Sequence, residues 1–292
     1  MPAQSIEGLN IKPNGVYVDL TFGAGGHAQA VLKQLSTNGK LYAFDQDLDS
    51  QTNNIADSRF VLINHNFRYI RNHLKFYGIE KVDGILGDLG VSSHQFDCPE
   101  RGFSTRFDCL LDMRMDRRKN LTAADILQTY QEAELSKIFY QYGEIHNAKS
   151  LAALIVKERD IKPFSTSKDF IHRIQSCIPK RKDYQYLAQL DQALRITVND
   201  EMDALQSVLK QSTELLHKGG RLVIISYHSL EDRMVKIFMR SGNFDDKQEK
   251  DFYGNDLSPF QLISRKAIVP DKNEIEANNR SRSAKLRIAE KK

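Results

Sequence analysis

The residues with the clearest chemical meaning in this sequence are two carboxylates on either side of a glycine-rich turn. The run Val16–His27, VYVDLTFGAGGH, is typical of an apolar strand that ends at Asp19 and is followed by a turn and a helix start. Glycines in such a turn allow positive φ and close approach of a ligand, and the turn holds Gly23, Gly25 and Gly26. Asp45 ends the next apolar run 22 residues after Gly23, where doubly wound folds place an acid against a ribose. The pattern predicts a nucleoside-binding pocket.

Asp19 helps to decide which nucleoside this pocket takes. The turn reads G-x-G-G and lacks the third glycine of the G-x-G-x-x-G dinucleotide pattern. A carboxylate beside a pyrophosphate is repelled, whereas a carboxylate beside an amino acid that carries a sulfonium is tolerated. S-adenosylmethionine therefore fits better than NAD, and an NAD-dependent oxidoreductase on the same fold is the rival enzyme.

The elements that position these residues alternate between strands and helices. Further strands are predicted at 59–63, 82–86 and 221–225, with helices between the earlier ones. This order predicts a doubly wound α/β domain with a parallel sheet, whose ligands bind beyond the carboxyl ends of the strands. The expected rim carries Asp19, Asp45, Phe67 and Asp88, and the exit of the fifth strand adds His228 and Glu231.

Each of the later rim residues also has a structural interpretation. Asp88 could cap the adjoining turn, and Phe67 could belong to the core. His228 and Glu231 could make hydrogen bonds within their loop. Ser229 and Asp232 are predicted to cap the helix that follows this loop.

From about Phe103 the pattern changes to a long charged loop and then to helices. The loop is predicted to be ordered and functional, with surface disorder as the alternative. Thr122 and Ser167 are predicted helix caps, and Asn199 is predicted to cap a helix after a tyrosine-rich segment returns the chain to the sheet. We expect an inserted helical substrate-recognition domain at 105–198 and a cofactor-binding domain made of 1–104 and 199–292.

The two ends of the chain carry weaker patterns. Residues 1–15 are polar and rich in turn-forming residues, which indicates a lead-in to the first strand. Residues 260–269 and 283–289 resemble two strands and predict an antiparallel hairpin at the edge of the sheet.

The distribution of charge bears on the partner. The chain of 292 residues has a formal net charge of only +4, yet basic residues gather at 114–119, 180–182 and 280–287. Such clusters are usual on solvated faces. Three on one chain, the middle one followed by Tyr184 and Tyr186, indicate an RNA or phosphate partner.

Cysteine usage and hydropathy narrow the class of protein. The three cysteines show neither a disulfide framework nor Cys-x-x-Cys spacing, which favours a reducing cytosol. No metal site is expected, although His94, Cys98 and Cys109 are the residues from which a partial one could be built. No apolar stretch is long enough to cross a membrane. The oligomeric state is open, and a homodimer is compatible with the sequence.

Beyond these patterns, the sequence resembles one family along nearly its whole length. The matching runs are DLTFGAGGH at 19–27, DGILGDLGVSSHQFD at 83–97, ERGFS at 100–104, LDMRMD at 111–116, GGRLVIISYHSLEDRMVK at 219–236 and RSRSAKLRIAE at 280–290. They are similar to the MraW family of bacterial ribosomal RNA methyltransferases, which use S-adenosylmethionine to methylate N4 of a cytosine in the 16S decoding region. The resemblance implies a class I methyltransferase fold with a helical insert, and 16S rRNA of the small ribosomal subunit as partner.

The resemblance also implies roles for particular residues. Cofactor contacts are expected at Gly25, Gly26, His27, Asp45 for the ribose, Phe67 near the adenine, Asp88 and Gln95. From the chemistry of the reaction, Asp88 or the backbone of Ser92 and Ser93, all at the exit of the fourth strand, is the expected acceptor of the proton from the amine, with His228 and Glu231 as second choices. The base, flipped out of its stack, and its phosphates are expected to meet Arg101, Phe103, Asp112 and Arg114.

The chain departs from the family pattern just before Gln192. Where the family usually shows a His-Pro-Ala-Thr-Arg-Thr-Phe run, residues 185–191 read QYLAQLD. A non-catalytic RNA-binding or ribosome-assembly protein with a vestigial cofactor pocket is therefore the alternative function.

Overall fold

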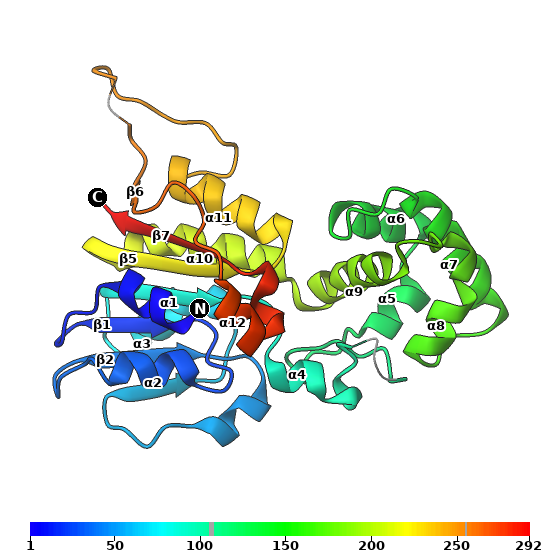
Figure 1. The fold of residues 1–292 in the computed structure, drawn as a ribbon, viewed down its shortest axis with the longest axis horizontal. Coiled ribbons are helices and arrows are strands. Elements are labelled where there is room, and N and C mark those ends of the chain that lie inside the picture. Colours follow the sequence, from blue (N-terminus) through cyan, green and yellow to red (C-terminus); the bar gives the residue numbers. More distant parts are fainter. Residues whose placement is uncertain (105–107, 255) are drawn as a thin grey trace. The chain divides into compact units, whose positions relative to one another are not determined.

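The structure is a computed structural model that describes residues 1–104, 108–254 and 256–292. Residues 105–107 of the long loop predicted from Phe103 onward therefore lie outside the described residues. The chain divides into two compact units, an α/β unit of Met1–Gly90 with Asp203–Lys292 and a helical unit of Val91–Met202 (Figure 1). That the helical unit recognises the substrate stays a prediction.

The α/β unit is built on a seven-stranded sheet with the order β3-β2-β1-β4-β5-β7-β6. The first five strands are parallel: β1 Val16–Asp19, β2 Lys40–Phe44, β3 Phe60–Ile63, β4 Val82–Asp88 and β5 Leu216–Ser226. The last two strands are antiparallel to their neighbours, β6 Phe260–Leu262 and β7 Lys285–Lys291. The predicted class I methyltransferase fold with an antiparallel edge is confirmed.

Helices cover both faces of this sheet, because alternate strand residues point to opposite sides. Tyr17 and Leu86 enter the cluster that α1 Pro2–Leu9 and α2 Gly26–Leu32 complete. Val18 and Ile85 enter the cluster on the other face, which contains residues of the helices α3 Ile70–Phe76, α10 Glu201–Leu215 and α11 Ser229–Ser241 (Figure 1). A short helix, α12 Lys272–Ala277, precedes β7.

The register of the parallel strands brings their carboxyl ends to one edge. Asp19 pairs with Ala43 of β2 and with Leu86 of β4, and Asp88 pairs with Ile225 of β5. The residues that follow β1, β2, β4 and β5 therefore start from neighbouring positions, as the sequence predicts.

The helical unit has a core of its own. Its helices are α4 Ser93–Asp97, α5 Ala123–Thr129, α6 Glu132–Gln141, α7 Ala148–Ile161, α8 Ser167–Arg173 and α9 Asp183–Asn199. Their apolar faces meet in one buried cluster, to which Leu135, Phe139, Leu151, Ile155 and Leu194 belong. Thr122 caps α5 in a reciprocal pair with Asp125, as predicted.

Local predictions about helices are wrong at residues 1–15, at the cap of α8 and in the tyrosine-rich segment. Residues 1–15 contain α1, a two-turn helix whose few apolar residues, among them Ile6 and Leu9, give too short a pattern to detect. The cap of α8 is Thr166, whose side chain accepts a hydrogen bond from the Asp169 N–H, while Ser167 bonds to the backbone N–H of Cys109. The tyrosine-rich segment forms α9, so the chain does not return directly to the sheet.

Asn199 does not cap α10, because it is the last residue of α9. Its buried side chain accepts a hydrogen bond from the Met115 N–H and donates one to the Met113 carbonyl, at 2.7 and 2.8 Å. Asp200 ends α9 in the left-handed conformation. Asn199 thus secures the long loop from within the helical unit.

The final strands differ in one respect from a simple edge hairpin. β7 lies between β5 and β6 and pairs with both. The predicted strand at 260–269 is reduced to β6 and to an isolated bridge between Ile268 and Leu286. Within the described residues, no helix combines the length and apolar character needed to span a membrane.

Candidate functional site

The glycine turn after β1 leaves open space at the start of α2. Gly23 and Gly25 have φ of 51° and 79°, a region that favours glycine. Apart from its chain neighbours and the backbone of α2, no atom of the described residues lies within 4 Å of a Cβ built on Gly26. The turn therefore leaves room for a ligand to lie against its backbone.

Asp45 fixes this turn from the exit of β2. Its Oδ2 accepts a hydrogen bond from the Gly23 N–H at 2.8 Å, and its Oδ1 accepts one from the Asp47 N–H at 2.9 Å. Burial raises the pKa of Asp45 to about 6, against the lowering effect of these two bonds. Each carboxylate oxygen has a second lone pair that a sugar hydroxyl could use.

Asp19 and His27 each have one buried polar side-chain atom that is available to a ligand. Asp19 Oδ1 accepts a hydrogen bond from the Thr21 N–H at 3.0 Å. Its Oδ2 and Nε2 of His27 are both buried, and neither atom has a hydrogen-bond partner among the described residues. Burial raises the pKa of Asp19 to about 6, with His27 acting in the opposite direction. Because an unsatisfied buried polar atom costs about 1–3 kcal/mol, such a pair indicates a place where a polar ligand binds.

Asp88, the last residue of β4, has one carboxylate oxygen engaged and one available. Tyr227 Oη donates to Oδ1 at 2.9 Å, and the Asp88 N–H donates to Thr21 Oγ1 at 2.7 Å. Oδ2 lies 3.8 Å from Nδ1 of His27 and accepts no hydrogen bond from the residues that the structure describes. Burial raises the pKa of Asp88, with His27 and Tyr227 opposing it. Because this side chain accepts no backbone N–H in the described part of the chain, the turn-cap interpretation is wrong.

His228 and Glu231 form the cap of α11, so their contacts favour the structural interpretation. Nδ1 of His228 accepts from the Glu231 N–H at 3.4 Å, and Oε2 of Glu231 accepts from the backbone N–H groups of Tyr227 and His228. The predicted cap by Ser229 and Asp232 is wrong, because Asp232 instead binds Lys285 and Arg287. A direct catalytic role for His228 or Glu231 stays a prediction.

Tyr227 is the functional candidate that the sequence analysis misses. It follows β5, which neighbours β4, and its hydroxyl is the group that bonds to Asp88. The signal was available: adjacent parallel strands place their exit residues side by side, and Tyr227 is a hydrogen-bonding residue at such an exit.

Phe67 follows β3 as the first residue of a 3₁₀ turn, Phe67–Tyr69. It is partly buried and packs against the core cluster of the sheet. The core interpretation therefore accounts for part of this side chain, and its contact with an adenine stays a prediction.

The remaining predicted residues belong to the helical unit. Gln95 is buried, and its Oε1 accepts a hydrogen bond from the Ser92 N–H in the cap of α4. Arg101 is 1% exposed and donates to the carbonyls of Arg114 and Met115. Phe103 is in the buried cluster of the same unit. Arg101 and Phe103 are thus interior residues, which argues against the predicted direct contact with an RNA phosphate or base.

Asp112 and Arg114 form a two-armed ion pair within the long loop. Arg114 Nε and Nη2 donate to the two Asp112 oxygens at 2.8 and 2.7 Å, and Nη1 donates to the Lys119 carbonyl. Burial works to raise the pKa of Asp112, but hydrogen bonds from Arg114 outweigh it and the pKa is lowered. Their geometry supports the loop, and a contact with substrate stays a prediction.

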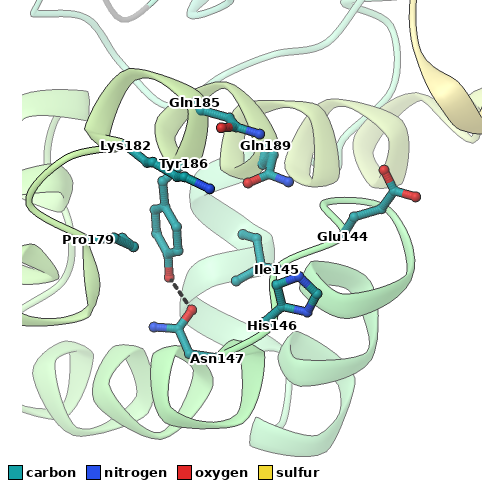
Figure 2. Close-up of a pocket in the computed structure, with 9 residues that line it drawn as sticks. All are labelled: Glu144, Ile145, His146, Asn147, Pro179, Lys182, Gln185, Tyr186 and Gln189. Atoms are coloured by element: carbon teal, nitrogen blue, oxygen red, sulfur yellow. Dashed lines mark hydrogen bonds between the residues drawn. The ribbon is translucent and has the colours of Figure 1, made fainter.

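A separate hollow of about 170 Å³ lies in the helical unit (Figure 2). Tyr186 is buried there and donates from its hydroxyl to Asn147 Oδ1 at 3.1 Å, so its ring is not an open stacking platform, unlike exposed Tyr184. The hollow includes Gln185, Tyr186 and Gln189 from the segment that departs from the family pattern, and its other lining residues are Glu144, Ile145, His146, Asn147, Pro179 and Lys182.

The groups at the strand exits of the α/β unit fit S-adenosylmethionine. Asp45 suits a ribose, the space over Gly26 admits the nucleoside, and the orphaned atoms of Asp19 and His27 suit the charged amino-acid end. Among the described residues, no group of three or more His, Cys, Asp or Glu side chains is placed to hold a metal ion. Sheet order and site together define a class I S-adenosylmethionine-dependent methyltransferase.

Comparison with known proteins gives the particular family. The model of the MraW methylase family matches residues 1–292, and the chain belongs to this family. It is 54% identical over 292 residues to the ribosomal RNA small subunit methyltransferase H of Flavobacterium psychrophilum, covering 100% of both chains. The protein of the same name from Phocaeicola vulgatus is 52% identical over 289 residues, covering 99% of this chain and 95% of the relative.

A search of solved structures gives a weaker likeness. The crystal structure of an rRNA methylase from Streptococcus thermophilus matches with a TM-score of 0.44 and 13% identity, covering 100% of this chain and 96% of that one.

Proposed function

We propose that this protein transfers a methyl group from S-adenosylmethionine to N4 of a cytosine in the decoding region of 16S ribosomal RNA. Membership of the methylase family and the names of its relatives support the reaction and the RNA substrate. The observation that supports the chemistry is Asp88, whose Oδ2 lies 3.8 Å from Nδ1 of His27 and accepts no hydrogen bond from the described residues.

Asp88 addresses the chief difficulty of this reaction. A cytosine amine is a poor nucleophile, because its lone pair is delocalised into the ring. A carboxylate oxygen that accepts an N–H of this amine localises the lone pair as the bond forms and then takes the proton. Since burial raises the pKa of Asp88, this carboxylate is a stronger base than an exposed one.

Bound S-adenosylmethionine supplies a methyl group on a positively charged sulfur with a neutral leaving group. What remains for the protein is to align the amine with this methyl group and to exclude water. Asp45 would hold the ribose, the backbone at Gly25 and Gly26 would receive the nucleoside, and Asp19 with His27 would meet the amino-acid end. Phe67 at the adenine and Gln95 complete the proposed set.

The basic clusters are the proposed contacts with RNA. Lys180, Arg181 and Lys182 are all exposed, and Arg117 and Arg118 are exposed on the long loop. The cluster at 280–287 is partly engaged, because Lys285 and Arg287 bind Asp232. Contacts between such side chains and phosphates make RNA affinity fall as salt rises.

Mass spectrometry tests the function directly. Small ribosomal subunits that lack the modification are incubated with the protein and isotopically labelled S-adenosylmethionine, and their digested RNA is searched for labelled N4-methylcytidine. We expect label at one cytosine of the decoding region. Binding of the subunits without any incorporation would contradict the proposal and favour the non-catalytic assembly protein.

A further inference from the structure

We infer that Tyr227 is a positioning residue for methyl transfer: its hydroxyl occupies Oδ1 of Asp88 and so reserves Oδ2 for the amine that receives the methyl group. This inference rests on the proposed function, because it concerns how Asp88 meets its substrate. The two oxygens of this carboxylate are not equivalent in the structure, and Tyr227 is the side chain that distinguishes them.

The position of Tyr227 is fixed by its backbone and by the packing of its ring. Its backbone N–H donates to Oε2 of Glu231 at 2.9 Å, so the cap of α11 fixes the start of the exit loop. Its ring abuts the exit of β4, where a Cβ added to Gly90 would lie 3.6 Å from the ring carbon Cδ2. Glu231 therefore holds the backbone of Tyr227, and His228 completes the cap of α11 that fixes Glu231.

Asp88 is restrained once at its backbone and once at its carboxylate. Thr21 Oγ1 accepts its backbone N–H at 2.7 Å, and Tyr227 Oη bonds to Oδ1 at 2.9 Å. The terminal torsion of an aspartate is otherwise broad, so an unrestrained carboxylate would sample many directions. A fixed direction for Oδ2 removes this reorganisation from the transfer step.

The tyrosine proton stays on the phenol throughout the working pH range. Burial and the negative charge of Asp88 raise the pKa of Tyr227 far above its ordinary value. The charged or titratable groups that face this pair are Asp19 from β1, His27 from α2, Glu231 from α11, Glu274 from α12 and the amino group of Met1. Since the phenol donates to the Asp88 carboxylate, this bond works to lower the pKa of Asp88 against the effect of burial.

Replacing Tyr227 by Phe removes only the hydroxyl and tests the inference. We expect kcat to fall roughly 10- to 100-fold, since one oriented hydrogen bond is lost, while KM for RNA and Kd for the cofactor change less than about 3-fold. The rate requires the Asp88 carboxylate, so it falls as pH drops through the Asp88 pKa. Because the variant raises this pKa, the acid limb of the rate profile should move to higher pH.

Two further proteins sharpen the measurement. Tyr17→Phe is the matched control, because Tyr17 is buried in β1 and its hydroxyl accepts a hydrogen bond from the Lys12 N–H at 2.7 Å, away from Asp88. It should leave the acid limb in place. Fluorotyrosine at position 227 keeps the ring and makes the phenol a stronger donor, so it should move the acid limb to lower pH, opposite to Phe.

Carbon-13 NMR of the Asp88 carboxyl, assigned with Asp88→Asn, gives a readout that does not depend on activity. A higher Asp88 pKa in Tyr227→Phe than in the wild type supports the inference even if the RNA substrate is different. An equal Asp88 pKa, an unmoved acid limb, or a loss in KM alone would overturn it and leave the proposed function standing. Wild-type protein without any methyl transfer would instead contradict the proposed function.

Discussion

The aspartates at the strand exits and the aspartates of the long loop in the helical unit have pKa values that are shifted in opposite directions. At the exits, burial raises the pKa of Asp19 and Asp45 to about 6 and also raises that of Asp88. In the loop, hydrogen bonds from Arg114 and Arg118 outweigh burial and lower the pKa of the Asp112 and Asp116 carboxyls.

This difference in pKa indicates which carboxylates can bind a ligand or accept a proton from it. An acid that is matched by an arginine two residues later has its charge and lone pairs committed to the fold. A buried acid without a cationic arginine or lysine partner is costly to keep ionised, which is a mark of functional sites. Sequence alone shows both kinds as Asp residues in loops, and only the environment separates them.

The largest effect is expected when the Asp88 carboxylate is removed. Asp88→Ala should lower the methyl-transfer rate about 10²- to 10⁴-fold, the range for a lost general base, with a change of less than about 3-fold in cofactor affinity. Single-turnover rates and calorimetric titration give the two numbers. Equal losses in both would reduce Asp88 to a cofactor ligand.

Asp45→Ala should act on binding instead of chemistry. We expect cofactor affinity to fall about 10- to 100-fold, because a ribose contact and the order of the Gly23 turn are both lost. Isothermal titration calorimetry measures this change. Asp57→Ala is the matched control, since Asp57 is an acid of the same unit that is already paired with Arg59, and its removal should leave affinity unchanged.

Asp19→Asn should stabilise the cofactor-free protein at neutral pH. The pKa of Asp19 in the folded state, about 6, lies above its value in the unfolded state. The contribution of Asp19 to the free energy of unfolding is therefore fully present below about pH 3.9 and is lost as pH rises through 6. Thermal denaturation at pH 7.5 should show Tm raised by about 2–4 °C, the shift for roughly 1 kcal/mol. At pH 4 the two proteins should melt together; a lower Tm for the variant at pH 7.5 would refute the assignment.

The smallest effect is expected in the loop. Asp112→Asn should destabilise the protein by about 0.5–1 kcal/mol at neutral pH, because a partly exposed ion pair is lost. With a lowered folded-state pKa, this stability is present above about pH 3.9 and disappears as pH falls through the lower value. Urea denaturation measures this change in the free energy of unfolding. A loss of cofactor affinity in the same variant would contradict the separation of the two groups of acids.

Much of the α/β unit was predictable because its signals are local and repeat. Alternating apolar runs, the glycine turn and polar residues at strand exits gave the parallel sheet and the set Asp19, Asp45 and Asp88. The capping box at Thr122 was likewise visible, because its two partners are three residues apart.

What could not be predicted depends on contacts between distant residues. Asn199 looks like a helix cap but bonds to backbone atoms of Met113 and Met115. Arg101 looks like a phosphate ligand, yet it is buried against carbonyls of its own loop. Tyr227 shows no motif by itself, and its importance comes from the neighbouring strand. Propensity and spacing do not report such pairings.

The placement of β7 has a consequence for how the protein is made. β5 sits between β4 and β7, so one side of β5 lacks its backbone partners until residues 285–291 have left the ribosome. The helical unit is continuous in sequence and precedes β5 in synthesis, whereas β5, which Tyr227 follows, lacks one of its two neighbours until residues 285–291 are made. A nascent chain stalled before β7 would therefore present an open strand edge, prone to pairing with other chains, next to the proposed site.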